Sequence, residues 1–170
     1  ILRCLVGSEM CIRDRMEVAN ASDRTICLVE TTRQVEEVIC GERGIIHGAK
    51  PGHIVICMST IDPTVAKRIA SDLLLQEILM LDAPVSGGTA RAQAADLTVI
   101  AGGEKKVFDQ CKDIFEAIGK DAFYIGDHGQ GLVMKLINNM LGITNTITLI
   151  EGLTIGCLLY TSDAADEWLR

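Results

Sequence analysis

The chain has 170 residues, of which 48% are hydrophobic and 23% are charged, so it is long and apolar enough for one globular domain rather than a disordered chain. Its formal net charge of −7 comes without any run of basic residues, which argues against nucleic acid and against an anionic membrane surface as partners. We identify no apolar run of transmembrane length, and therefore expect no membrane-spanning segment.

The seven cysteines are scattered and form no C-x-x-C pair. Their odd number and the apolar runs around several of them favour buried free thiols in a reducing compartment over a disulfide framework or a zinc site. The three histidines lack the spacing of metal ligands, so we expect no metal site. We therefore expect a cytoplasmic protein, with the mitochondrial matrix as the alternative.

The two ends of the chain, residues 1–15 and 157–170, show no periodicity that continues into their neighbours. Both resemble translated sequencing-adaptor sequence, and we expect them to be non-native tails. The first of them contains Glu9 and Asp14 and has no clean apolar centre, so it is not typical of a signal peptide. The authentic segment would then be a fragment, residues 16–156.

Between these tails, short β-rich runs alternate with helical patterns. Strands are expected over residues 25–29, 53–58, 78–81, 97–101 and 122–125. A helix is expected through Val35, Val38 and Ile39, with Thr31 or Thr32 as its N-cap. Further helices are expected over residues 63–75, 89–95 and 104–118, with a long final helix from residue 129. This alternation predicts an α/β fold with a mostly parallel, doubly wound sheet.

The final helix combines an apolar surface with two polar side chains. Gly129 and Gly131 open it, and apolar residues then surround it to about Leu153, which predicts a buried helix. Lys135 and Asn139 are four residues apart and so project from the same face. Polar groups on a buried helix need partners or a function. The alternative is that Lys135 extends to solvent and Asn139 caps a loop, and spacing alone leaves both interpretations open.

Two segments that follow expected strands are candidate ligand contacts. Open α/β sheets bind ligands at the carboxyl ends of their strands, where Thr60 is expected to lie, although Ser59 or Thr60 could simply cap the next helix. The run Ser86-Gly87-Gly88 offers a hydroxyl and backbone N–H groups suited to a carboxylate or phosphate. It could equally be a turn that needs positive φ. The sequence contains no G-x-G-x-x-G fingerprint for a dinucleotide.

Several segments, in this order, resemble the β-hydroxyacid dehydrogenases, a 6-phosphogluconate dehydrogenase-like family. They are residues 59–63 (STIDP), 82–88 (DAPVSGG), 97–103 (LTVIAGG) and the pattern G-x-G-x-x-x-K-x-x-N-N from residue 129. The resemblance covers residues 25–156. It implies that residues 16–128 form a partial Rossmann-type NAD(P)-binding domain without its first βαβ unit. Residues 129–156 would be the interdomain helix that opens a truncated all-α domain.

The resemblance also implies roles for the candidate residues on the substrate side. Lys135 corresponds to the catalytic lysine of the family, and Asn139 to the asparagine that orients the substrate. Ser86, Gly87 and Gly88 correspond to the loop that holds the substrate carboxylate.

On the cofactor side, Thr60, Val29 and Glu30 correspond to contacts with NAD or NADP. Two positions depart from the family pattern. The family usually has Leu-Pro where this chain has Val29-Glu30, and often has Asp where this chain has Cys57.

The activity implied is NAD(P)-dependent interconversion of a short 3-hydroxy acid and its semialdehyde or keto acid, of the 3-hydroxyisobutyrate or 2-hydroxy-3-oxopropionate type, with Lys135 as general acid and base. An L-threonate dehydrogenase-type enzyme is one alternative, and a non-catalytic dehydrogenase-like binding or oligomerisation module is another. The partner expected is a small carboxylate, with a homo-oligomer in the full-length form. Because the glycine-rich first turn and most of the helical domain are missing, we expect this fragment to be inactive.

Overall fold

The computed structural model describes residues 14–160, and expectations for residues 1–13 and 161–170 lie outside it. Its strands are β1 (Arg24–Cys27), β2 (Ile54–Cys57), β3 (Leu79–Asp82), β4 (Val85–Ser86), β5 (Leu97–Gly103) and β6 (Gly119–Gly126). Its helices are α1 (Arg15–Asn20), α2 (Thr32–Cys40), α3 (Pro63–Leu74), α4 (Gly88–Gln93), α5 (Lys105–Gln110), α6 (Lys112–Ile118) and α7 (Gln130–Tyr160), with a 3-10 turn, η1, at Ile45–His47.

The predicted α/β fold with a Rossmann-type parallel sheet is confirmed. Strands β1, β2 and β3 are parallel neighbours, and Cys27, Cys57 and Asp82 are aligned across their carboxyl ends. The strand order is β1-β2-β3-β5-β4, with β6 paired to β5. The loops that leave the first three strands therefore meet at one edge of the sheet.

The orientation of β5 differs from a simple parallel alternation. β5 pairs antiparallel with β3 and with β4, and parallel with β6. A parallel crossover usually needs a dozen or more residues that include a full helix. Here β4 and the six-residue α4 take up the connection after β3, so the chain turns back on itself.

The helix expected over residues 104–118 is two helices. The chain breaks at Cys111, where φ is −105° and ψ is 5°, between α5 and α6. Cys111 is buried, and the break allows the rings of Phe108 and Phe115 to lie 5.4 Å apart, centroid to centroid, in one cluster. A continuous 3.6-residue period does not reveal a break of this kind, because apolar residues follow on both sides of it.

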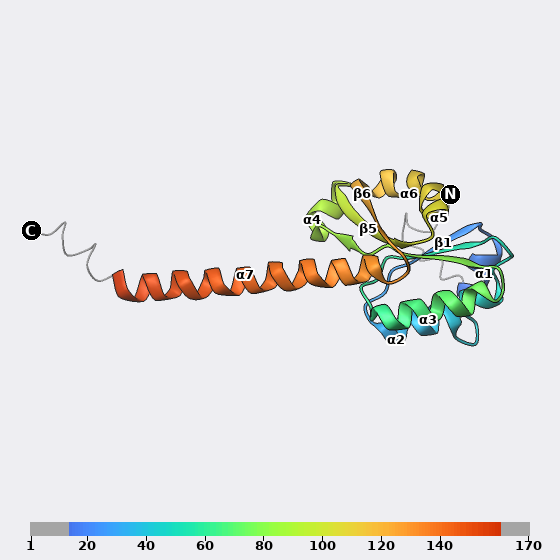
Figure 1. The fold of residues 1–170 in the computed structure, drawn as a ribbon, viewed down its shortest axis with the longest axis horizontal. Helices are drawn as coiled ribbons and strands as arrows, with labels where there is room; N and C mark the ends of the chain where they lie inside the picture. The colour runs from blue at the N-terminus through green and yellow to red at the C-terminus, as the bar shows by residue number, and fades with distance from the viewer. Residues whose placement is uncertain (1–13, 161–170) are drawn as a thin grey trace, which may run out of the picture. The chain divides into compact units, whose positions relative to one another are not determined.

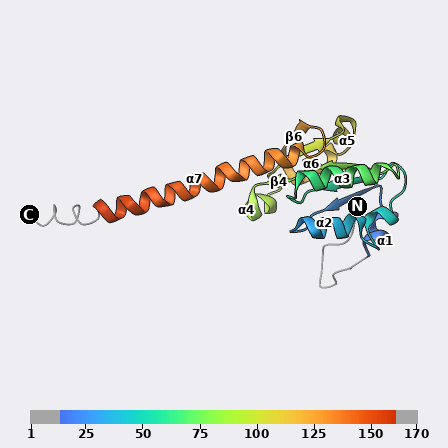
Figure 2. The same ribbon diagram turned by 60° about the horizontal axis from the view of Figure 1, so that its bottom comes forward.

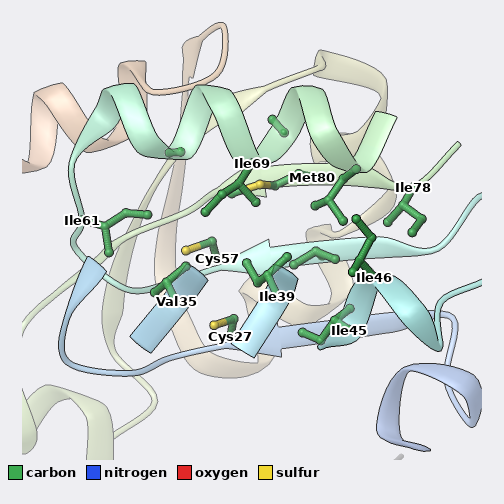
Figure 3. Close-up of a cluster of buried hydrophobic side chains, with 14 of the residues drawn as sticks. Cys27, Val35, Ile39, Ile45, Ile46, Cys57, Ile61, Ile69, Ile78 and Met80 are labelled. Carbon is green, nitrogen blue, oxygen red and sulfur yellow. The ribbon is translucent and has the colours of Figure 1, made fainter. Parts of the chain in front are cut away.

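The two faces of the sheet are covered by different helices. α2 and α3 cover one face, and α5 and α6 cover the other (Figure 1), an arrangement that the turned view also shows (Figure 2). On the first face, Val35, Ile39 and Ile69 pack with Cys27 and Cys57 (Figure 3). Burial of each large aliphatic side chain contributes about 1.5–3 kcal/mol to stability.

The sequence places Cys27, Cys57 and Cys157 in apolar runs and favours buried thiols. Cys27 and Cys57 are buried free thiols, as is Cys111, but Cys157 is exposed, so the expectation of burial is wrong for it. Cys27 and Cys57 lie directly opposite one another on neighbouring strands. The adjacent Cys27 thiol, and then burial, hold the pKa of Cys57 well above its usual range.

α7 differs from expectation beyond its first turns. The chain divides into two compact units with the boundary after Lys135, inside this helix. Apolar side chains after this point are exposed, so the expectation of a buried helix is wrong for them; they include Leu136, Ile137, Met140, Leu141, Ile143, Ile147, Leu149, Ile150 and Leu153. An apolar composition such as that of α7 favours burial of a helix. A helix is buried, however, only where it packs against another element.

The length of α7 also corrects an expectation. Residues Gln130–Leu159 are long enough to cross a membrane and reach a mean hydropathy of 1.4, contrary to the expectation that no segment has transmembrane length. Core helices of soluble proteins satisfy the same criteria, so this observation alone assigns no membrane location.

The described end of the expected N-terminal tail makes ordered contacts. Arg15 begins α1, and its guanidinium lies 3.2 Å from the carboxylate of Glu37. Asp14 pairs with Arg43 at 2.6 Å. Surface pairs of this kind contribute little to stability. The proposed boundaries of the tails remain predictions.

Buried polar side chains join β1 to β2 at both ends. Near their amino ends, Nδ1 of His53 donates to the carbonyl of Ser22 at 3.0 Å, which leaves Nε2 to accept from the hydroxyl of Thr25 at 2.9 Å. Near their carboxyl ends, the hydroxyl of Ser59 accepts from the amide of Val29 at 2.7 Å. These bonds hold the loops that leave β1 and β2 against each other.

The buried imidazole of His53 predicts that the free energy of unfolding depends on pH. Burial lowers the pKa of its imidazole, so the folded state keeps the ring neutral while the unfolded chain binds a proton below about pH 6.5. The free energy of unfolding should therefore fall as the pH drops from 7.5 to 5 in urea titrations. His53→Gln should lose this part of the fall, whereas His47→Gln, at an exposed position, should retain it. Equal pH profiles for the two variants would contradict the assignment.

The buried hydrogen bond of Ser59 predicts that replacing this serine lowers the stability of the fold. Its side chain is 1% exposed, and Ser59→Ala leaves the amide of Val29 without its partner. We expect a loss of about 1–3 kcal/mol in the free energy of unfolding, measured by urea titration. Ser71→Ala is the matched control, because its exposed hydroxyl bonds only to the carbonyl of Lys67 in the same helix. A loss no larger than that of the control would remove the role given to Ser59.

Candidate functional site

The cofactor-side candidates all lie in loops at the carboxyl edge of the sheet. β1 ends at Cys27, so Val29 and Glu30 follow it in a loop, the first half-buried and the second exposed. Thr60 is half-buried in the loop after β2. Ser59, which sequence reasoning left as a possible cap, links the two loops through its bond to Val29.

The structure excludes one interpretation of Thr60, that it caps α3. α3 is capped by Asp62, whose carboxylate accepts the amide of Thr64 at 2.7 Å, so neither Ser59 nor Thr60 is its N-cap. The hydroxyl of Thr60 makes no hydrogen bond within residues 14–160. It therefore remains available to a ligand at this edge.

The substrate-side loop has a backbone that only glycine adopts easily. Ser86 ends β4, paired with Thr98 of β5, and Gly87 and Gly88 follow with φ of 141° and 68°. A side chain at Gly87 would also lie 2.9 Å from the Cβ of Arg91. The interpretation as a glycine-dependent turn is thus confirmed, and it leaves the half-buried Ser86 hydroxyl without a bond among the described residues.

Lys135 is the most unusual side chain of the first unit. It is 8% exposed, although its neighbours Val133, Met134 and Leu136 are each more than 40% exposed. No hydrogen bond or ion pair to its ammonium is found within residues 14–160. Burial lowers the pKa of Lys135. Lys135 therefore does not extend freely to solvent, and its ammonium is available for chemistry.

The position of Lys135 depends on the first turns of α7. Leu132, three residues earlier on the same helix face, is fully buried in the core that α3 covers. A side chain at Gly131 would lie 2.5 Å from the carbonyl oxygen of Ile100, so β5 and α7 meet backbone to backbone. This close contact holds the face that carries Lys135 toward the sheet.

Sequence reasoning missed Asp82 as an individual residue, although it belongs to the 82–88 segment. Its carboxylate is fully buried at the end of β3 and accepts the amides of Gly129 at 2.7 Å and Leu132 at 3.1 Å. Burial raises the pKa of Asp82, while these two amides oppose the rise. An acidic residue at the end of an otherwise apolar strand is the signal that could have singled it out.

The remaining substrate candidate, Asn139, lies one turn after Lys135 on α7 and is half-buried. It belongs to the second unit, and its proposed contact with substrate remains a prediction. Within residues 14–160 no group of His, Cys, Asp and Glu side chains is arranged to hold a metal ion.

The residues at the edge suit one end of a dinucleotide. A nicotinamide ring has apolar faces and a polar carboxamide, which match the half-buried Val29 and the available hydroxyl of Thr60. The pyrophosphate end is different, because the sequence has no G-x-G-x-x-G turn to hold it. The exposed carboxylate of Glu30 adds no donor for phosphate.

Comparisons with known proteins agree on the family. Residues 5–126 match the family described as the NAD binding domain of 6-phosphogluconate dehydrogenase. The probable mitochondrial 3-hydroxyisobutyrate dehydrogenase of Dictyostelium discoideum is 37% identical over 140 residues, which is 82% of this chain and 44% of that protein. The 2-(hydroxymethyl)glutarate dehydrogenase of Eubacterium barkeri is 34% identical over 150 residues, which is 88% of this chain and 50% of that protein.

The fold is shared with solved structures of the same group. The crystal structure of a 3-hydroxyisobutyrate dehydrogenase from Salmonella typhimurium superposes with a TM-score of 0.77 at 31% identity, over 86% of this chain and 51% of that one. The chain thus spans about half the length of the relatives that it matches. It belongs to the family of the NAD binding domain of 6-phosphogluconate dehydrogenase, among the β-hydroxyacid dehydrogenases that these relatives represent.

Proposed function

We propose that the protein to which this chain belongs is an NAD(P)-dependent dehydrogenase of short 3-hydroxy acids, with Lys135 as its general acid and base. The observation that carries the proposal is the burial of Lys135, which is 8% exposed, together with the lack of a partner for its ammonium within residues 14–160. A lysine whose pKa is lowered by burial, and whose ammonium has no partner, is a functional candidate when it lies near the carboxyl edge of such a sheet.

The relatives suggest what the substrate has in common. 3-Hydroxyisobutyrate and 2-(hydroxymethyl)glutarate, named in two of them, both carry a primary alcohol on the carbon next to the one that bears a carboxylate. The loop of Ser86, Gly87 and Gly88 would hold that carboxylate through its hydroxyl and backbone N–H groups. Asn139 would orient the alcohol from the next turn of α7.

The chemistry of Lys135 follows from its protonation state. A bound nicotinamide cofactor supplies the hydride acceptor or donor. In the oxidation direction, neutral Lys135 takes the proton of the substrate hydroxyl at Nζ, and in the reverse direction the ammonium returns it. A lowered pKa increases the neutral fraction near physiological pH, which favours the base form.

Thr60 and Val29 would line the nicotinamide, with Glu30 at the exposed rim. The cofactor would be NAD or NADP. We propose a reducing compartment, the cytoplasm or the mitochondrial matrix, and a homo-oligomer of the whole protein. A panel of 3-hydroxyisobutyrate, L-threonate and 2-(hydroxymethyl)glutarate would separate the substrate alternatives.

Lys135→Ala tests the catalytic role. Residues 24–156 would replace the matching segment of the Salmonella typhimurium relative, and turnover would be followed by the absorbance of the reduced cofactor. We expect Lys135→Ala to lower kcat by roughly 100- to 10,000-fold while cofactor binding persists. Lys106→Ala, at an exposed position of α5, is the control. Undiminished kcat in the Lys135 variant would remove the proposed role.

The 170-residue chain by itself should behave differently from the chimera. Because it has no glycine-rich turn for the pyrophosphate, we expect weak binding of NADH in fluorescence titrations and no turnover of 3-hydroxyisobutyrate. Measurable dehydrogenase activity of the purified chain would contradict this expectation.

A further inference from the structure

The buried carboxylate of Asp82 caps a helix from outside that helix. The first amides of a helix have no partner within it, and a side chain just before the helix normally supplies one. For α7, both oxygens of Asp82 do so from the end of β3, 47 and 50 residues away along the chain. The negative charge also interacts favourably with the positive end of the helix dipole.

The cap acts where α7 is pressed against the sheet. Asp82 is paired with Gly102 of β5, and a side chain at Gly102 would lie 2.8 Å from a carboxylate oxygen of Asp82 and 2.8 Å from the amide of Gly131. The two carboxylate oxygens of Asp82 accept the amides of Gly129 and Leu132, which are three residues apart. The two bonds together restrain rotation of the first turn about the helix axis and its translation along that axis. Lys135 lies one further turn along the face of Leu132.

Asp82 also begins the segment that leads to Ser86. Three residues separate Asp82 from Ser86, and two of them, Ala83 and Pro84, are buried. The same carboxylate is thus attached to the loop proposed to hold the substrate and bonded to the helix that carries the proposed base.

We infer that Asp82 is a positioning residue: its two bonds to the start of α7 hold Lys135 in its buried, unpartnered place relative to the Ser86–Gly88 loop. It acts through the helix and does not need to touch a substrate. The geometry stands by itself, and only the use made of Lys135 rests on the proposed function.

Two titratable groups face Asp82. Nδ1 of His128 lies 4.0 Å from its carboxylate and is the buried polar side-chain atom without a partner among residues 14–160. The thiol of Cys57 lies on the neighbouring strand, and the carboxylate contributes to its raised pKa. Neither group bonds to the carboxylate, so the two amides are its main support.

The test follows Lys135 directly in the full 170-residue chain. Lysines are dimethylated with ¹³C-formaldehyde, the Lys135 signal is identified by its loss in Lys135→Arg, and its pKa is measured by NMR titration. We expect a pKa below about 10.4 in the unsubstituted chain and a return toward that value in Asp82→Ala. Hydrogen exchange at Leu132 should accelerate by about tenfold or more.

Two further variants keep the test decisive. Asp82→Asn keeps the shape and one acceptor oxygen, so it should give an intermediate shift and exchange rate, and it carries the test if Asp82→Ala does not fold. Asp62→Ala removes the cap of α3 instead, and should lower stability while the Lys135 signal stays unchanged.

Loss of stability in Asp82→Asn with an unmoved Lys135 pKa and unmoved Leu132 exchange would overturn the inference and leave Asp82 a purely structural residue. The outcome is separate from that of the proposed function. If Lys135 responds to Asp82 but Lys135→Ala keeps full turnover in the chimera, only the catalytic role of the lysine fails.

Discussion

The structure depends on strand β2 being covered on both faces. Its residues alternate between two clusters: Val55 and Cys57 belong to the one that α2 and α3 cover, whereas Ile54 and Ile56 belong to the other. A strand in this position must have a layer of helices on each side, which is the three-layer solution for a parallel sheet. Because β1 and β3 pair in parallel with β2, their outgoing loops meet at one edge, and that edge is where the candidate site lies.

Polar groups at this edge are buried only where they join elements. Ser59 ties the loop after β1 to the loop after β2, and Asp82 ties β3 to α7. Each satisfies backbone amides that would otherwise be buried without partners. Lys135 is the exception among the candidate residues, since it is buried and satisfies nothing within the part of the chain that the structure describes. This contrast separates groups that hold the site together from the group proposed to act in it.

The match to the family model covers only part of this arrangement. The chain matches the NAD binding domain over residues 5–126, but α7, with Lys135 and Asn139, lies beyond that match. The relatives extend the likeness into the helix, and the chain spans about half of their length. Val29 and Thr60, which we propose to contact the nicotinamide, lie at this edge of the sheet. A G-x-G-x-x-G turn for the pyrophosphate does not occur in the sequence.

The sequence by itself determined the local features: the apolar β2, the start of α3 at Asp62-Pro63, the glycine turn at Gly87-Gly88, and the order of motifs that indicates the family. These depend on neighbouring residues and on periodicity. Tertiary structure decided the antiparallel β5, the break at Cys111, the exposure of α7 beyond Lys135, and the role of Asp82 as a cap 47 residues distant. Each of these depends on which segment lies alongside another, and no local pattern encodes the partner of a buried carboxylate or the cover of an apolar helix.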